Sequence, residues 1–131
     1  MKYRLDYQET HDIDWFFRYR GRVYHAASNG GILPDKVDSL NNRKLQERLE
    51  EIPAGYEVNL SERMLNRQDE DLSSFREYAA KGFISLDRND DAREVLRYHR
   101  VAFPVNGEVF SNEELLRLMP ELGDNEIQIE E

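Results

Sequence analysis

The alternation of apolar and polar positions predicts two neighbouring β-strands near the start of the chain. Residues 13–19 and 22–27 are rich in aromatic and β-branched side chains and flank Arg20-Gly21. Two such runs around a glycine are typical of a β-hairpin, whose loop we expect to contain two to four residues. Residues 3–8 also alternate apolar and polar side chains, which predicts a further strand.

A helical pattern replaces this alternation after residue 34. Pro34-Asp35 is typical of a helix start, because proline fits the first turn and aspartate can cap it. Apolar residues then recur at helical spacing on one predicted stripe, which ends before Pro53: Val37, Leu40, Leu45, Leu49 and Ile52. Residues 56–60 alternate as a short strand does, and the polar residues 61–71 fit a short helix or a loop.

The second half of the chain predicts a helix, two strands, a hairpin and a last helix. The helix covers residues 72–81, with Gly82 at the position of a left-handed cap. Strands follow at 83–86 and from Val95 onward, and Asn106-Gly107 between apolar runs is a strong hairpin signal. A last helix of about two turns then begins at a capping box formed by Ser111 and Glu114, and it ends near Pro120.

Together these elements predict an α+β fold in a single domain that covers residues 1–122. We expect a mainly antiparallel sheet built from hairpins, with about three helices packed on it, because tight hairpins outnumber regular crossovers in the pattern. Residues 123–131 form an acidic C-terminal tail that is expected to be either an edge strand or disordered. No repeat or linker divides the chain further.

Composition excludes several classes of protein. The 131 residues are 39% hydrophobic and 34% charged, which fits one soluble domain with a core. The chain contains no cysteine, so disulfides, cysteine-based metal centres and a cysteine nucleophile are excluded. No segment approaches the roughly 20 apolar residues of a membrane span, and no signal peptide is recognisable. We therefore expect a cytoplasmic protein without a membrane partner.

Charge is distributed unevenly along the chain. The net charge of −9 is the sum of +1 in residues 1–34, −3 in residues 35–107 and −7 in residues 108–131. This balance opposes general nucleic-acid binding, which needs clustered lysine and arginine to neutralise phosphates. The arginines that alternate with aromatic residues in the hairpin are better interpreted as solvated side chains lying over rings. They are Arg18, Arg20 and Arg22.

Candidate chemistry is concentrated in residues 11–31. A two-residue turn at Arg20-Gly21 would place Phe16 opposite His25 and make Asp14 the diagonal neighbour of His25. The resulting histidine–carboxylate pair is interpreted first as a cross-strand contact. Together with His11-Asp12 it also offers nitrogen and oxygen ligands for a divalent ion. The spacing matches no known metal motif, so we expect neither a metal nor another cofactor.

Ser28 and the glycines after it suggest two further kinds of site. A serine hydrolase would require Ser28 to reach His25, but the two side chains point to opposite faces of an extended strand. The N–H groups of Ser28-Asn29-Gly30-Gly31 could surround an anion, yet the segment lacks the P-loop pattern and is typical of a strand-to-helix connection. The candidate ligand-binding residues are thus Asp14, His25, Ser28, Asn29, Gly30 and Gly31.

Three hypotheses about function follow. The first is a non-catalytic protein-interaction domain that binds a partner protein or a second copy of itself, because the chain combines many aromatic residues with no catalytic motif. The alternative is a small ligand- or metal-binding domain, or an enzyme, that uses residues 11–31. The second alternative is an acidic inhibitor that imitates nucleic acid, based on the acidic last segment.

Overall fold

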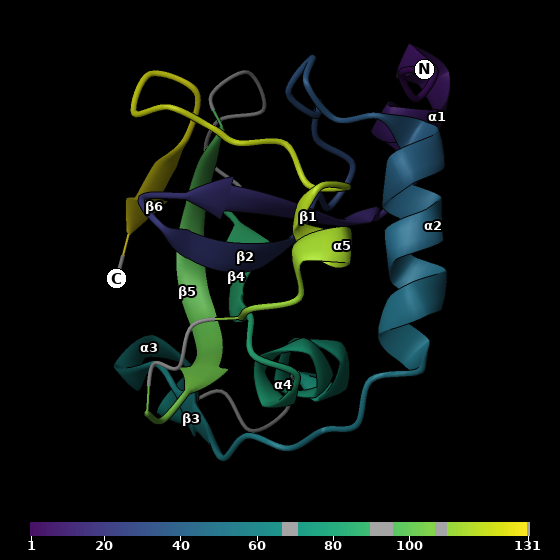
Figure 1. The fold of residues 1–131 in the computed structure, drawn as a ribbon. Helices are drawn as coiled ribbons and strands as arrows, with labels where there is room; N and C mark the ends of the chain where they lie inside the picture. Colours follow the sequence, from purple (N-terminus) through teal and green to yellow (C-terminus); the bar gives the residue numbers. More distant parts are fainter. Residues whose placement is uncertain (67–70, 90–95, 107–109, 131) are drawn as a thin grey trace.

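The structure is a computed structural model that describes residues 1–66, 71–89, 96–106 and 110–130. Within these residues the chain forms six strands and five helices (Figure 1). In chain order they are α1 (Leu5–Thr10), β1 (Asp14–Tyr19), β2 (Arg22–Ala27), α2 (Ser39–Glu50), β3 (Val58–Leu60), α3 (Glu62–Leu65), α4 (Ser73–Ala80), β4 (Ile84–Arg88), β5 (Arg97–Pro104), α5 (Glu113–Leu116) and β6 (Gln128–Glu130).

All six strands belong to one mixed sheet. Its order is β1-β2-β4-β5-β3, and β6 also pairs with β5. The β1–β2, β4–β5 and β3–β5 pairs are antiparallel, whereas β2–β4 and β5–β6 are parallel. The α+β prediction is confirmed, but the expectation of a mainly antiparallel sheet built from hairpins is wrong. Parallel neighbours require long crossover connections, and the local apolar pattern does not encode which distant strands pair.

The first hairpin forms as the sequence predicts. Its turn consists of Arg20 and Gly21, both at positive φ, 50° and 74°. This geometry matches the right-handed twist of the flanking strands, and it fixes the register with Phe16 opposite His25. The hairpin is therefore confirmed, with a loop at the short end of the expected two to four residues, and this loop places Phe16 and Asp14 beside His25.

Residues 3–8 do not form the expected strand. Leu5–Thr10 is the short helix α1, and the rings of Tyr3, Tyr7 and His11 stack along it at four-residue spacing. Buried Gln8 ties the helix down, because its amide donates to the Tyr3 carbonyl and its Oε1 accepts from the Leu33 N–H. The period-two pattern was misleading here because long-range contacts, rather than local preference, decide so short a segment.

The second helix begins later than predicted. Asp38, rather than the Pro34-Asp35 pair, caps α2 through a 2.9 Å bond from the Asn41 N–H. Leu45 and Leu49 are buried as expected, but Leu40 is 56% exposed and does not belong to the buried stripe. Because the helix starts after residue 38, Leu40 lies in its first turn on the side that faces away from the sheet.

The later elements agree with the predictions more closely. Helix α4 ends at Ala80, Gly82 follows it with a φ of 108°, and β4 begins at Ile84. Helix α5 is shorter than expected, and its cap is Asn112, whose Oδ1 accepts from the Leu115 N–H, rather than Ser111. The predicted Asn106-Gly107 hairpin extends into residues 107–109, which lie outside the described ranges.

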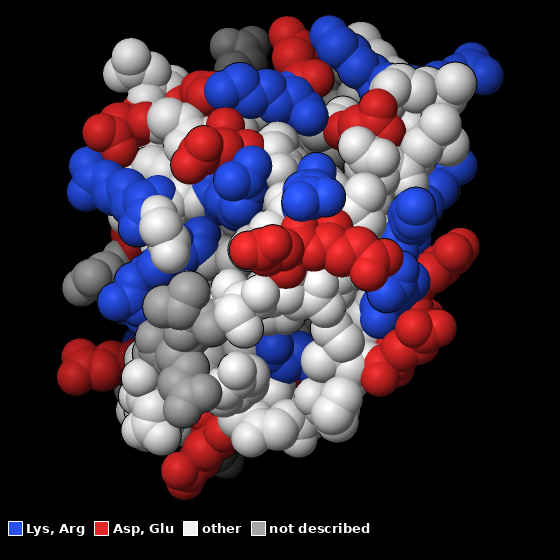
Figure 2. Space-filling view, in the orientation of Figure 1, with Lys and Arg blue, Asp and Glu red and all other residues white. Residues whose placement is uncertain are grey.

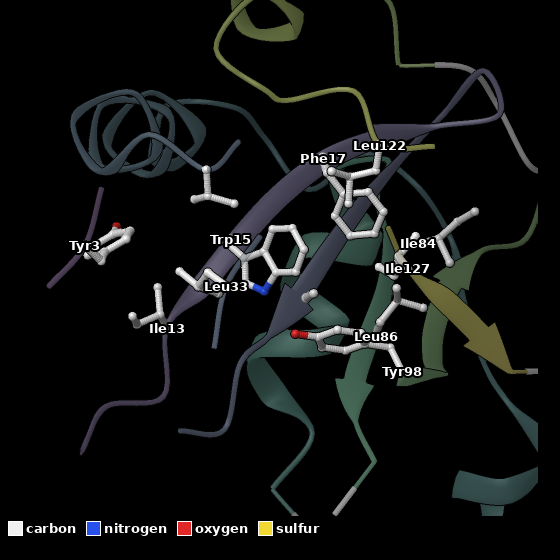
Figure 3. Packing of buried hydrophobic residues seen from close by; sticks show 12 residues of the cluster. Tyr3, Ile13, Trp15, Phe17, Leu33, Ile84, Leu86, Tyr98, Leu122 and Ile127 are labelled. Carbon is white, nitrogen blue, oxygen red and sulfur yellow. The ribbon is translucent and has the colours of Figure 1, made fainter. Parts of the chain in front are cut away.

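The sheet carries a hydrophobic cluster on each face. Trp15 and Phe17 of β1 point into one cluster with Tyr98 of β5, and the chain segments near both termini cover it (Figure 3). Phe16, between them in sequence, points into the other cluster, which helices α2 and α5 cover. Complete burial of each such side chain contributes about 1.5–3 kcal/mol, so both faces of β1 stabilise the domain. No helix in the described residues is long and apolar enough to cross a membrane.

Candidate functional site

The structure brings His25 together with two residues from other strands. Its Nε2 lies 2.7 Å from Oδ1 of Asp14 on β1, and its Nδ1 lies 3.0 Å from Oγ of Ser85 on β4. The Ser85 hydroxyl in turn donates to the Phe75 carbonyl of α4 at 2.9 Å. The predicted histidine–carboxylate pair therefore exists, and it continues through a serine that lies 60 residues away from His25 in sequence.

Aromatic rings enclose the imidazole of His25. The ring centroids of Tyr78, Phe16 and Phe75 lie 4.3, 5.4 and 5.8 Å from its own. Burial, with the nearby Asp14 carboxylate as the next cause, raises the pKa of Tyr78 to about 12. The phenol therefore stays protonated at neutral pH, and it forms part of an apolar wall around the histidine.

Access decides what this group can do chemically. His25 and Ser85 are fully buried, whereas the side chain of Asp14 is 32% exposed. A nucleophilic serine must reach a substrate carbonyl, and Ser85 cannot do so while strands and α4 cover it. The arrangement links β1, β2, β4 and α4 through hydrogen-bonded polar groups, of which His25 and Ser85 are buried.

The other predicted residues of the segment lie apart from this network. The Ser28 hydroxyl accepts from the Ile13 N–H at 2.7 Å and donates to the His11 carbonyl at 3.4 Å. It therefore fastens the end of β2 to the chain before β1. Parity along the strand separates it from His25, as the sequence predicts.

The backbone of residues 29–31 is occupied by protein acceptors. The Asn29 N–H donates to Asp12 Oδ1 at 2.8 Å, the Gly30 N–H to the His11 carbonyl at 3.2 Å, and the Gly31 N–H to the Ser28 carbonyl at 2.8 Å. These N–H groups close a tight turn with Asn29 and Gly30 at positive φ. A cradle for an anion would need the same groups to point outward.

His11 and Asp12 do not join Asp14 and His25 around a common point. His11 stacks on Tyr7 and its Nδ1 lies 3.0 Å from the Tyr7 carbonyl, while Asp12 accepts from Asn29. In the part of the chain that the structure describes, no three histidine or carboxylate side chains are close enough to hold a metal ion.

Exposed apolar side chains gather at one end of the molecule. Seven large hydrophobic residues are exposed in the described ranges, and five of them lie in or beside α1, the loop before α2 and the first turn of α2. We call these five residues the N-terminal surface: Met1, Leu5, Tyr7, Ile32 and Leu40. Figure 1 shows α1 beside the start of α2 at this end. The apolar pattern alone missed this surface because it assigned Leu5 to a strand and Leu40 to the core.

The acidic C-terminal segment, of which the structure describes residues 110–130, packs against basic residues of other elements. Residues 120–122 bond to both backbone groups of Arg18, and β6 pairs with β5. The carboxylates of this segment form ion pairs with residues from several elements: Glu114 with Arg48, Asp124 with Arg20, Glu126 with Lys36, and Glu130 with Arg63 and Arg97. On the face seen in Figure 2, basic and acidic side chains are accordingly interspersed.

The ion pairs of Asp124 and Glu126 lower the pKa values of the carboxyl groups that take part in them. The Arg20 and Tyr19 hydrogen bonds hold the pKa of Asp124 below its usual value, and Lys36 does the same to the pKa of Glu126. Arg20 also lies over the Tyr19 ring at 5.4 Å, as the sequence predicts for arginines in this hairpin. The charges of Asp124 and Glu126 are thus compensated within the chain.

Comparison with known proteins gives no relative from which a function could be transferred. No protein-family model, curated protein or solved structure matches the chain.

Proposed function

We propose that the protein is a non-catalytic interaction domain that pairs with a second copy of itself through the N-terminal surface. The observation that carries this proposal is the concentration of exposed apolar side chains there, with Leu5 59% and Leu40 56% exposed. Solvated apolar side chains that gather at one end of a domain are typical of a protein interface. In a two-fold dimer the same surface meets itself, so apolar contacts are automatically matched.

The charge distribution favours a second copy as the occupant. Residues 1–44, which contain this surface, carry eight basic and six acidic groups, whereas residues 45–131 carry 10 and 21. The part of the chain that contains this surface therefore brings little net charge into a contact between two copies. Charges at the surface are also paired within the chain, as in Lys2–Asp35 at 3.2 Å and Arg4–Asp6 at 3.4 Å, so little uncompensated like charge opposes self-contact.

The two alternatives receive less support from the geometry. An enzyme or ligand site in residues 11–31 would need an accessible reactive group, but His25 and Ser28 are fully buried, and the N–H groups of residues 29–31 donate to acceptors of the protein itself. A nucleic-acid mimic would need carboxylates free to meet a basic partner, whereas Asp124 and Glu126 hold Arg20 and Lys36 of the same chain.

Light scattering over a range of protein concentrations tests the proposal. We expect a dimer that dissociates on dilution, and a double variant, Leu5→Glu with Leu40→Glu, that remains a monomer. Both positions are exposed, so the charges leave the core intact, but in the dimer they would be buried without a partner and weaken association at least about tenfold.

Leu65→Glu is the matched control. Leu65 is 55% exposed on α3, outside the N-terminal surface, so this variant should dimerise as the unchanged protein does. A protein that stays monomeric at every concentration, or a Leu65 variant that dissociates as fully as the double variant, would refute the proposal.

A further inference from the structure

A second surface feature lies between β1 and α5, away from the N-terminal surface. It is a hollow of about 330 Å³ lined by Arg18, Glu113, Leu116 and Arg117. Glu113, Leu116 and Arg117 are spaced three and four residues apart, so they share one face of α5 and the residue that follows it. The volume is within the range of small-ligand sites, and the hollow opens to solvent.

Arg18 is held in place at this hollow. Its Nε and Nη2 both donate to the Met119 carbonyl at 3.4 Å, and its backbone bonds to Pro120 and Leu122 at 2.9 Å each. The two side-chain bonds restrict the guanidinium, so less side-chain entropy is lost when another group binds. The guanidinium is thus preorganised beside the apolar side chain of Leu116.

The two arginines of the hollow carry charge that no carboxylate of the described residues pairs with. Among the described residues, neither Arg18 nor Arg117 forms an ion pair, although acidic residues exceed basic ones by 27 to 18. Even Glu113, which lines the same hollow, is paired with neither. In so acidic a protein, two guanidinium groups at one hollow without a carboxylate partner are positioned to accept one from outside.

We propose that this hollow binds a carboxylate attached to a short apolar body, with Arg18 and Arg117 as its cationic partners. Guanidinium groups bind carboxylates through charge-assisted, often bidentate hydrogen bonds. Leu116 supplies an apolar wall for the carbon chain beside the carboxylate. Glu113 repels a second negative charge and can accept from an N–H group of the ligand, which disfavours dianions such as phosphate.

An N-acylated apolar amino acid carries all of these groups, and so does the C-terminal residue of a peptide. The two sources share one chemistry, namely a carboxylate, an adjacent N–H and an apolar side chain. The inference does not depend on self-association, because no residue of the hollow belongs to the N-terminal surface.

NMR titration of the full chain with N-acetyl-leucine tests the inference. We expect saturable shifts confined to the backbone amides of residues 113–119 and to Arg18, including its Nε–H. N-acetyl-leucinamide has the same body without the charge and should bind at least about tenfold more weakly. Inorganic phosphate should also bind more weakly, because Glu113 opposes its second charge.

Arg117→Gln should weaken N-acetyl-leucine binding about tenfold, since it removes one cationic partner from an exposed position. The matched control is Arg22→Gln, which makes the same charge change on β2 outside the hollow and should alter the dissociation constant less than about twofold. Arg18→Gln keeps a donor for Met119 and should weaken binding as Arg117→Gln does. Loss of folding in the Arg18 variant would leave the Arg117 comparison to decide.

The peptide Ala-Ala-Leu with a free carboxylate distinguishes the two sources. Binding at least about tenfold tighter than that of N-acetyl-leucine supports a peptide C-terminus as the ligand, and equal binding supports a small acid. Equal binding of acid and amide, equal losses in the Arg117 and Arg22 variants, or shifts spread over the whole surface would overturn the inference.

Discussion

At the scale of single residues, His25 shows how a buried polar group is made compatible with a small core. Its two ring nitrogens lie at Asp14 and Ser85, and Phe16 and Tyr78 pack around its ring. A buried polar atom without a hydrogen-bond partner costs roughly 1–3 kcal/mol. Each hydrogen bond of the network avoids this cost for the two atoms that it joins. The network therefore stabilises the contact between the hairpin and β4.

Replacement of Ser85 by alanine tests this role. The change leaves Nδ1 of His25 buried without its partner, so we expect the free energy of unfolding to fall by about 1–3 kcal/mol in urea titrations. Ser74→Ala, at an exposed position of α4, should change stability by less than about 0.5 kcal/mol. If both variants are as stable as the unchanged protein, the network contributes nothing to folding.

At the scale of elements, the sequence predicts best what is decided locally. The hairpin turn at Arg20-Gly21 and the glycine that ends α4 follow from residue types at fixed offsets, and the Asp14–His25 pair follows from the hairpin register. Ser85 could not be added to that pair from the sequence, because it depends on the parallel pairing of β2 with β4. Helix α1 was missed for the same reason, since distant contacts hold it.

Gly82→Ala tests the end of α4. Gly82 has a φ of 108°, and its N–H and that of Phe83 bond to the carbonyls of Ala79 and Tyr78. An added Cβ would lie 3.1 Å from the Tyr56 ring in a backbone conformation that disfavours alanine. We expect a loss of about 1–2 kcal/mol in thermal or urea unfolding.

Gly55→Ala provides the contrast for this substitution. An added Cβ there meets nothing within 4 Å, and the residue has no positive φ, so stability should stay the same or rise slightly. Equal losses at Gly55 and Gly82 would show that the left-handed cap is not the cause.

At the scale of the whole molecule, electrostatics fasten the acidic C-terminal segment to the rest of the domain. Asp124 accepts from the Tyr19 hydroxyl at 2.6 Å and from Arg20 at 3.0 Å, and Glu126 accepts from Lys36 at 2.8 Å. An isolated exposed ion pair contributes little to stability, but several pairs along one segment all oppose the local unfolding of that segment. In this protein, whose net charge is −9, some of the carboxylates thus hold the C-terminal segment against β1 and against the part of β5 that pairs with β6.

The pH dependence of this closure has a definite sign. Partners lower the pKa values of Asp124 and Glu126 in the folded state below their ordinary values of 3.8 and 4.5. The stabilisation is therefore complete above those ordinary values and is lost as the pH falls through the lower folded values. We expect the amide protection factors of Leu122 and Gln128 to fall on acidification before those of β4 do.

Asp124→Asn should reproduce part of this loss for Leu122 at neutral pH, whereas Asp6→Asn, at the opposite end, should not. If protection at Leu122 is lost only together with that of β4, the segment opens with the whole domain and its ion pairs do not control it.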